Sequence, residues 1–367
     1  MACDFFNLAT PGVQGLHPYL PGKPVDELER ELGISDSIKL ASNENPLGPS
    51  PKAIAAIKKS LVESCRYPDA NGFKLKQALV SHYGISATGI TLGNGSNDVL
   101  ELIARAFIKP GDEVIYSEHA FVVYMLVTQA TGAKAVVTPA RNWGHDLDAM
   151  AAAITDKTRI IFIANPNNPT GTWLSQLQLQ AFLAKVPEDV IVVLDEAYTE
   201  YVAEVEFPDG FKLQKSYPNL VVTRTFSKAF GLAALRVGFA VANPVITDLL
   251  NRVRQPFNVN APALEAAAAV LDDKEYLQRS VEMNHCGMRQ LEVGLIALGC
   301  NWIPSVGNFI TVDCGRDALA IYEGLLREGV IVRPVANYKM PNHLRVTVGL
   351  ESENSRFLIA FEKVIQA

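Results

Sequence analysis

Continuous apolar runs alternate with amphipathic stretches through the middle of the chain. The runs "RIIFIA" (159–164), "VIVVLD" (190–195) and "NLVVTRT" (219–225) are rich in β-branched residues and predict strands. Between the first two, "LSQLQLQAFLAKV" (174–186) has the spacing of a helix. Apolar strands separated by helices are typical of a buried parallel sheet. The pattern predicts an α/β fold with a mainly parallel sheet flanked by helices.

The two ends of the chain have other patterns. The first 45 residues are rich in Pro and Gly and contain one predicted helix, "VDELEREL". Beyond the sheet, a long helix over 262–298 and a helix near 317–328 alternate with short strands, which predicts a smaller α+β domain. We therefore expect three parts: an N-terminal segment that packs with the small domain (1–45), a large domain (46–260) and the small domain (261–367).

Polar side chains follow each of the three predicted strands. The first strand leads into "NPNNPTG" (165–171), the second ends in Asp195 before Tyr198, and the third runs into Thr225, Ser227 and Lys228. Each group alone has a structural explanation: a turn, a helix cap, a core aromatic or a solvated lysine. Ligands bind beyond the carboxyl ends of parallel strands, so the three groups together predict a site at this edge.

A fourth stretch, "TLGNGSNDVLELIARAF" (91–107), reads as a strand end, a glycine turn and an amphipathic helix. Ser96 or Asn97 would lie at the helix N-terminus, where free N–H groups and the helix dipole favour an anion. No GKS or GKT follows, so the stretch is not a Walker A loop. An ordinary capped helix would have the same sequence, but beside the polar strand ends the stretch predicts a phosphate site.

The stretch "TFSKAFGLAALRVG" (225–238) places Lys228 and Arg236 among small and apolar residues. A buried ammonium is costly unless it is paired, neutralised or chemically used. Pyridoxal 5′-phosphate would use it, because the cofactor's aldehyde forms a Schiff base with a lysine and its ring nitrogen needs a carboxylate such as Asp195. The fork of Arg236 suits the cofactor phosphate.

The same cofactor explains other polar and aromatic positions. Asn168 and Tyr198 can donate hydrogen bonds to the ring oxygen, and Phe121 or Tyr124, in "HAFVVY", can stack on the ring face. Arg333 and Arg345 flank a loop between two predicted strands and could project into the cleft, although two arginines on a surface hairpin would look the same.

At these residues the chain resembles the fold-type-I aminotransferases. The resemblance lies in "NPNNPTG", "DEAY", "SKAFGLAALRVG" and "LRVTVG", in that order, and covers almost the whole chain. "YLPGKP", "LASNENPLGPSP" (40–51) and "RYPD" (66–69) are similar to the histidinol-phosphate aminotransferases within that group. One departure is His119-Ala120, which stands where many relatives have Pro-Thr before the stacking aromatic.

The resemblance implies a role for each matching position. It implies a homodimer with shared active sites, because the tyrosine of "RYPD" would reach the cofactor phosphate of the neighbouring subunit. The implied catalytic residues are Lys228, Asp195 and Tyr198; the cofactor would contact Ser96, Asn97, Phe121, Asn168, Asp195, Tyr198, Thr225, Ser227, Lys228, Arg236 and Tyr67; and the substrate would contact Tyr19, Asn43, Arg333 and Arg345.

The implied reaction is ping-pong transamination between L-glutamate and imidazole-acetol phosphate, which gives L-histidinol phosphate and 2-oxoglutarate. Three alternatives stay open: an aromatic amino acid aminotransferase on the same scaffold, a decarboxylase of a phosphorylated amino acid, and a non-catalytic pyridoxal-phosphate-binding module.

Composition restricts the partners and the setting. The net charge of −6, without a basic run, predicts no nucleic-acid binding, and no apolar stretch reaches the ~20 residues that span a bilayer. The N-terminus lacks the pattern of a signal peptide, and five scattered cysteines without a CxxC pair favour the reducing cytoplasm. The six histidines lack HExxH or paired spacing, so we expect them on helix surfaces or loops and predict no metal.

Overall fold

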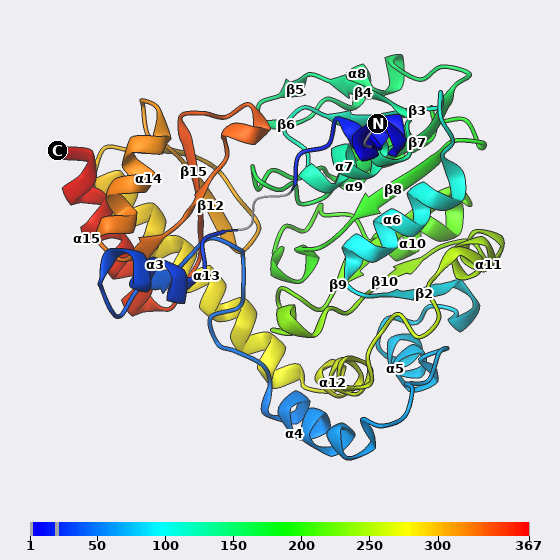
Figure 1. Ribbon diagram of the computed structural model, residues 1–367, viewed down its shortest axis with the longest axis horizontal. Helices are drawn as coiled ribbons and strands as arrows, with labels where there is room; N and C mark the ends of the chain where they lie inside the picture. The colour runs from blue at the N-terminus through cyan, green and yellow to red at the C-terminus, as the bar shows by residue number, and fades with distance from the viewer. Residues whose placement is uncertain (1–2, 19–21, 367) are drawn as a thin grey trace.

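A seven-stranded sheet forms the centre of the molecule in the computed structural model, which describes residues 3–18 and 22–366 (Figure 1). The strand order is β2-β10-β9-β8-β7-β3-β4. β10 runs antiparallel to both neighbours, while the pairs from β9 to β4 are parallel. The α/β fold with a mainly parallel sheet is confirmed. The strands are β2 (Ile90–Gly93), β3 (Glu113–Ser117), β4 (Lys134–Thr138), β7 (Thr158–Ala164), β8 (Ile191–Asp195), β9 (Leu220–Thr225) and β10 (Gly238–Val241).

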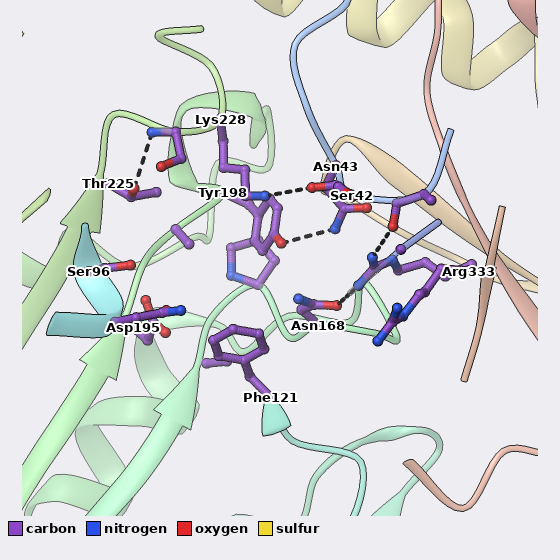
Figure 2. A pocket seen from close by; sticks show the side chains of 18 of the residues that line it. Ser42, Asn43, Ser96, Phe121, Asn168, Asp195, Tyr198, Thr225, Lys228 and Arg333 are labelled. Atoms are coloured by element: carbon purple, nitrogen blue, oxygen red, sulfur yellow. Dashed lines mark hydrogen bonds between the residues drawn. The ribbon is translucent and has the colours of Figure 1, made fainter. Parts of the chain in front are cut away.

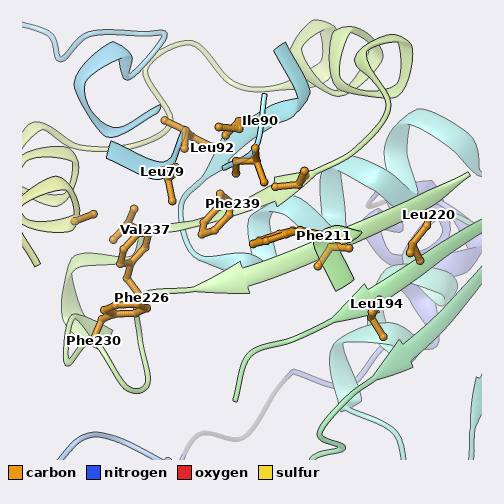
Figure 3. Packing of buried hydrophobic residues seen from close by; sticks show 14 of the residues in the cluster. Leu79, Ile90, Leu92, Leu194, Phe211, Leu220, Phe226, Phe230, Val237 and Phe239 are labelled. Atoms are coloured by element: carbon orange, nitrogen blue, oxygen red, sulfur yellow. The ribbon is translucent and has the colours of Figure 1, made fainter. Parts of the chain in front are cut away.

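Both faces of this sheet are buried, which is why its strands lack polar alternation. Val192 and Leu194 of β8 point into one core with Phe211 and Phe239, whereas Val193 points into a second core on the opposite face. Figure 3 shows the first core, with Leu194 and Leu220 at one end and Phe226 and Phe230 at the other. The sheet is thus the middle layer of three.

Helices cover the two faces. The first core is closed by α5 (Phe73–Tyr83), α8 (Leu147–Ala152), α9 (Gln176–Leu183), α10 (Gly210–Ser216) and α12 (Ala261–Leu271). The second is closed by α6 (Ser96–Phe107), α7 (Val122–Ala130) and α11 (Pro244–Val253). The helix expected over 174–186 is α9, which begins after Ser175 because the side chains of Ser175 and Gln178 form a capping box.

A second, four-stranded sheet lies to the left in Figure 1 and has the order β11-β12-β15-β14. Leu291, Leu325 and Phe357, one from each of three helices, pack on it to form a separate core. The sheet consists of β11 (Asn301–Ile303), β12 (Phe309–Asp313), β14 (Arg333–Pro334) and β15 (His343–Thr347), and its helices are α13 (Lys274–Ala297), α14 (Ala318–Arg327) and α15 (Glu351–Gln366).

The single helix expected over 262–298 is wrong. The chain forms α12 and α13 instead, with Asp272 and Asp273 between them. The Asp273 side chain accepts the backbone N–H of Tyr276 and caps α13, which favours a new helix start over continuation. α12 therefore packs beside α4 (Pro51–Ser60), while α13 continues to the four-stranded sheet.

The N-terminal segment contacts both halves of the molecule. α3 (Val25–Leu32) and β1 (Ile38–Lys39) lie beside the four-stranded sheet, where β1 pairs in parallel with β13 (Val330–Ile331). α1 (Phe5–Leu8) precedes α2 (Pro11–Gln14), which packs on α7; a Cβ on Gly12 would lie 2.1 Å from the Gln129 carbonyl oxygen. We propose the three-part division at residues 45 and 260 for the whole chain, with the first helix after residue 260, α12, packing into the core of the large domain. Among the described residues, no helix has the length and apolarity to cross a bilayer.

Candidate active site

The carboxyl ends of β7, β8 and β9 meet at one edge of the sheet. The register pairs Ala164 with Asp195 and Asp195 with Thr223, so the polar groups that follow these strands are brought together as predicted. They open into a cavity with about 910 Å³ of atom-free space, mouth included, between the two sheets (Figure 2). Of the predicted site residues, it is lined by Asn43, Ser96, Asn97, Phe121, Asn168, Asp195, Tyr198, Thr225, Ser227, Lys228, Arg236, Arg333 and Arg345.

Lys228 projects into this cavity from the loop after β9. Its Nζ donates a hydrogen bond to the Ser42 carbonyl oxygen at 3.0 Å and lies 5.6 Å from the centre of the Tyr198 ring. Burial, together with the nearby Arg345 guanidinium, lowers the pKa of the Lys228 amine to about 7. The amine is therefore available in its neutral, nucleophilic form near neutral pH.

Asp195 ends β8 on the opposite side of the cavity from Asn168 and Arg333. Its two carboxylate oxygens accept hydrogen bonds from Tyr124 Oη at 2.9 Å and Thr223 Oγ1 at 3.0 Å. Burial raises the pKa of Asp195, and these two hydrogen bonds oppose that shift by stabilising the charged form. A buried carboxylate with fixed orientation is suited to a cationic N–H partner.

Beside Asp195, the start of α6 and the loop before β10 form a cluster of N–H and hydroxyl groups. Gly95 precedes α6 with φ of +86°, and a Cβ there would lie 2.4 Å from Arg236 Nη2. Arg236 has φ of +55° and donates to Ser227 Oγ at 3.2 Å. A non-glycine residue in the left-handed region is strained, and such strain is concentrated at functional sites. Ser96, Ser227 and Arg236 line this part of the cavity and supply the type of hydrogen-bond donor that an anion requires.

The other end of the cavity is formed by residues from the four-stranded sheet and the N-terminal segment. Arg345 Nη1 donates to Asn168 Oδ1 at 2.6 Å, and Nη2 donates to the Ala41 carbonyl oxygen at 2.7 Å. Asn43 Nδ2 donates to Tyr198 Oη at 3.0 Å, and burial raises the pKa of Tyr198 to about 12, so its hydroxyl stays protonated. With Arg333, this end can bind a second anion.

The cavity thus contains an amine with a pKa of about 7, a buried carboxylate, and donor groups suited to an anion at each of its two ends. Comparison with known proteins agrees with this arrangement. A family model for aminotransferase class I and II matches residues 35–361. The chain belongs to this family. The site residues listed above all lie within the matched range.

Individual relatives identify a group within this family. The chain is 62% identical over 367 residues to histidinol-phosphate aminotransferase 2 of Pseudomonas fluorescens, with 100% of this chain and 99% of the relative covered. It is 60% identical over 364 residues to the enzyme of the same name from Pseudomonas aeruginosa, with 99% of each covered. Among solved structures, histidinol-phosphate aminotransferase from Sinorhizobium meliloti in complex with pyridoxal-5′-phosphate superposes with a TM-score of 0.90 at 29% identity, covering 97% of both chains. Within the class I and II aminotransferases, the chain belongs with the histidinol-phosphate enzymes.

Two further predicted site residues are Tyr19 and Tyr67. Tyr19 lies outside the described residues. Tyr67 is 82% exposed on the surface, where its ring stacks on Phe257 at 4.6 Å, and it does not line the cavity of its own chain.

Two sequence interpretations are corrected. Tyr124 does not offer its ring to the cavity, because it is fully buried, stacks on Phe162 at 4.6 Å and uses its hydroxyl on Asp195. His145 and His343 are buried in strands rather than on a helix surface or in a loop, and His119 lies in a loop as expected but is buried. Among the described residues, no group of three or more His, Cys, Asp or Glu could hold a metal ion, and the absence of a metal stays a prediction.

Sequence reasoning missed several residues of the site. Ser42 and Tyr338 line the cavity, and Thr223 holds Asp195. Ser42 and Tyr338 come from segments more than a hundred residues from the strand ends, so the strand pattern does not point to them. Thr223 had a signal, because a hydroxyl two residues before the end of a buried strand is unusual.

Proposed function

We propose that this chain is a pyridoxal-phosphate-dependent histidinol-phosphate aminotransferase, which exchanges an amino group between L-glutamate and imidazole-acetol phosphate. The observation that carries the proposal is the position of Lys228 in one cavity between the Asp195 end and the Arg345 end. Full-length identity of about 60% to curated enzymes of that name supports the choice of substrate.

The residues present fit the cofactor. A Cβ at Gly95 would lie 2.4 Å from Arg236 Nη2, and one at Gly238 would lie 2.5 Å from Ser96 N, so these two glycines allow the start of α6, Arg236 and β10 to pack closely beside the proposed phosphate site. Ser96, Asn97, Thr225, Ser227 and Arg236 would hold the phosphate, Asp195 the ring nitrogen, Phe121 the ring face and Tyr198 and Asn168 the ring oxygen. When bound, the cofactor supplies a ring that accepts electrons from the substrate carbon.

Lys228 acts as the general base in this proposal. Its Nζ takes the proton from the Cα of the amino donor in the first half-reaction. In the second half-reaction, which runs in reverse, it gives a proton to the Cα of the new amino product. Burial and the cationic neighbours Arg345 and Arg236 keep the amine neutral enough to accept it near pH 7. The carboxylate of Asp195, held by Tyr124 and Thr223, keeps the ring nitrogen protonated.

Arg345 and Arg333 bind the anionic ends of both substrates. The guanidinium of Arg345 is oriented by Asn168 and the Ala41 carbonyl, so its position is defined before substrate arrives. A guanidinium donates hydrogen bonds to a carboxylate or to a phosphate. The Arg345 end of the cavity can therefore bind glutamate and a phosphate ester in turn. Asn43 orients Tyr198, and Tyr19 would close over the bound substrate.

The exposure of Tyr67 supports a homodimer with shared active sites. A large aromatic that is 82% exposed beside the 40% exposed Phe257 is a candidate interface position. In the proposed dimer, Tyr67 reaches the cofactor phosphate bound to the partner subunit. A cytoplasmic location, expected from the scattered cysteines, stays a prediction.

A steady-state comparison of amino donors tests the substrate. We expect kcat/KM for L-histidinol phosphate, with 2-oxoglutarate as acceptor, to exceed that for L-phenylalanine. A clearly higher kcat/KM for phenylalanine would identify an aromatic aminotransferase instead. Release of carbon dioxide without a keto-acid acceptor would indicate the decarboxylase, and purified protein without visible absorbance after addition of pyridoxal phosphate would indicate that the cofactor proposal fails.

A further inference from the structure

A contact between the two halves of the molecule lies beside the cavity. His119, in the loop from β3 to α7, is buried, and its Nδ1 lies 2.7 Å from the main-chain oxygen of Tyr338, in the turn between β14 and β15. A carbonyl oxygen only accepts, so Nδ1 carries the proton and donates it. Phe121, two residues after His119, lines the cavity, as does Tyr338.

A second pair reinforces this contact. Glu118 Oε2 lies 3.5 Å from Lys339 Nζ, and Oε1 of the same carboxylate accepts the backbone N–H of Ala140 at 3.0 Å. Lys339 is mostly exposed, so solvent screens the ion pair and its own contribution is small. Two neighbouring residues of one loop thus contact two neighbouring residues of the other.

A tryptophan orients the imidazole. Asn142 and Trp143 have φ of +51° and +66° and form the two-residue turn between β5 (Ala140–Arg141) and β6 (Gly144–His145). This turn places the Trp143 ring 5.4 Å from His119 and 5.0 Å, edge-on, from His343 of β15. Trp143 therefore contacts a histidine from each half of the molecule.

Residues that contact His119 are neighbours in the chain of residues that line the cavity. Its carbonyl oxygen accepts from Asn167 Nδ2 at 3.0 Å, and the next residue, Asn168, accepts from Arg345. The turn that His119 holds joins β14, which carries Arg333, to β15, which carries Arg345. The Tyr338 ring packs with Val335 and Met340 against Val122 of α7. Movement of this turn would thus move both arginines relative to the Phe121 wall.

We propose that His119 is a positioning residue for the aminotransferase reaction: by donating to the Tyr338 carbonyl it holds the 335–342 turn against the seven-stranded half and sets where Arg333 and Arg345 present their guanidinium groups. The proposal rests on the proposed function for the identity of the anions. It concerns neither cofactor capture nor proton transfer, so a variant at this position should change substrate binding and leave both of those intact.

Two matched variants separate the hydrogen bond from the ring. His119→Phe keeps a ring beside Trp143 but removes the donor, whereas His119→Asn keeps an N–H donor near the position of Nδ1 and removes the ring. We expect His119→Phe to raise the apparent Kd for L-glutamate in the single-turnover half-reaction about tenfold, the usual scale of a lost buried hydrogen bond, with the maximal rate and the cofactor Kd within about twofold of wild type. His119→Asn should bind glutamate within about threefold of wild type.

Hydrogen exchange supplies a readout that needs no substrate. Amides of residues 335–342 should exchange faster in the His119→Phe holoenzyme than in wild type, and His119→Asn should restore their protection. The proposal would be overturned if His119→Phe showed unchanged hydrogen exchange or unchanged glutamate binding. It would also be overturned if His119→Asn were as defective as His119→Phe. Wild-type holoenzyme that fails to react with glutamate would overturn the proposed function instead, while the exchange comparison would still decide the role of His119.

Trp143→Ala serves if His119→Phe does not fold, because Trp143 lies in a two-residue hairpin turn and its loss removes ring packing on His119 and His343 but leaves the imidazole donor in place. The expected result is about a threefold weaker glutamate binding with faster exchange over 335–342. Unchanged values for both would count against the proposal.

Discussion

At the scale of single residues, the proposed chemistry depends on Lys228, whose environment disfavours the charge it would carry in water. The amine lies near the guanidinium groups of Arg345 and Arg236 and donates a hydrogen bond to the Ser42 carbonyl oxygen. The sequence alone shows the residue and its small neighbours, but the 186-residue separation of Ser42 from Lys228 hides that contact.

Substitution of Lys228 by alanine should abolish turnover, because the base and the tether to the cofactor are lost together. We expect a decrease in kcat of about 10³-fold or more with unchanged circular dichroism, measured beside Lys212→Ala, an exposed lysine on α10, as a control. Substantial activity in Lys228→Ala would show that another lysine does the work.

The pKa of Lys228 also predicts how cofactor capture depends on pH. Capture needs the neutral amine, and its folded-state pKa of about 7 lies below the ordinary lysine value of 10.5. The rate should therefore rise about tenfold per pH unit below 7 and level off above about 8. Stopped-flow absorbance after mixing cofactor-free enzyme with pyridoxal phosphate measures it, and a rate that still climbs between pH 8 and 10 would contradict the lowered pKa.

At the scale of elements, the strand ends and the start of α6 were predictable. Each combines a strong local pattern with a polar residue at the carboxyl end of a strand or at a helix N-terminus, where ligands commonly bind. The division of α12 from α13 was not, since alanine-rich sequence favours one continuous helix and the cap at Asp273 competes with it locally. β10 was missed as well, because a strand of four residues carries too little signal.

Gly95 tests the close approach at the start of α6. Gly95→Ala should weaken the cofactor Kd by about tenfold or more, because its Cβ would displace the Arg236 guanidinium. The matched control is Gly111→Ala, which has a similar φ of +92° but nothing within 4 Å of the added Cβ. Absorbance titration with pyridoxal phosphate should find Gly111→Ala close to wild type. Equal effects would mean that backbone strain alone is responsible.

The buried ion pair between Glu196 and Arg224 links β8 to β9 directly behind the site. Arg224 donates to Glu196 Oε2 through Nε at 2.9 Å and Nη2 at 2.7 Å. Glu196→Ala would leave a buried guanidinium uncompensated and should destabilise the protein by about 3 kcal/mol. Arg252→Ala, which breaks the exposed pair with Asp248, should cost less than about 1 kcal/mol. Comparable losses in thermal unfolding of both variants would refute this difference.

At the scale of the whole molecule, Tyr67 is the residue that one chain cannot explain. Its predicted partner is the cofactor of another subunit, so neither local sequence pattern nor the contacts within one chain show its role. Within one chain, the Tyr67 ring forms an exposed stack with Phe257.

Co-expression of two inactive variants tests the shared site. In a heterodimer of Lys228→Ala and Tyr67→Ala chains, one site carries both defects and the other carries neither. If the two chains associate at random, about a quarter of wild-type activity should return, although each variant alone is impaired. Purified variants mixed as preformed homodimers serve as the control, and a co-expressed sample no more active than that mixture would argue against shared sites.

The reversed direction of β10 has a consequence for the tolerance of the chain to changes in length. Because β9 and β10 are paired antiparallel, with Thr225 opposite Gly238, the intervening twelve residues leave and re-enter the sheet at one edge and carry both Lys228 and Arg236. An insertion in this return would leave the strands paired but rotate one cation away from the cavity. Surface loops that contact no part of the cavity can change length without this effect, so we expect the spacing of these two cations to be held constant while the lengths of such loops vary.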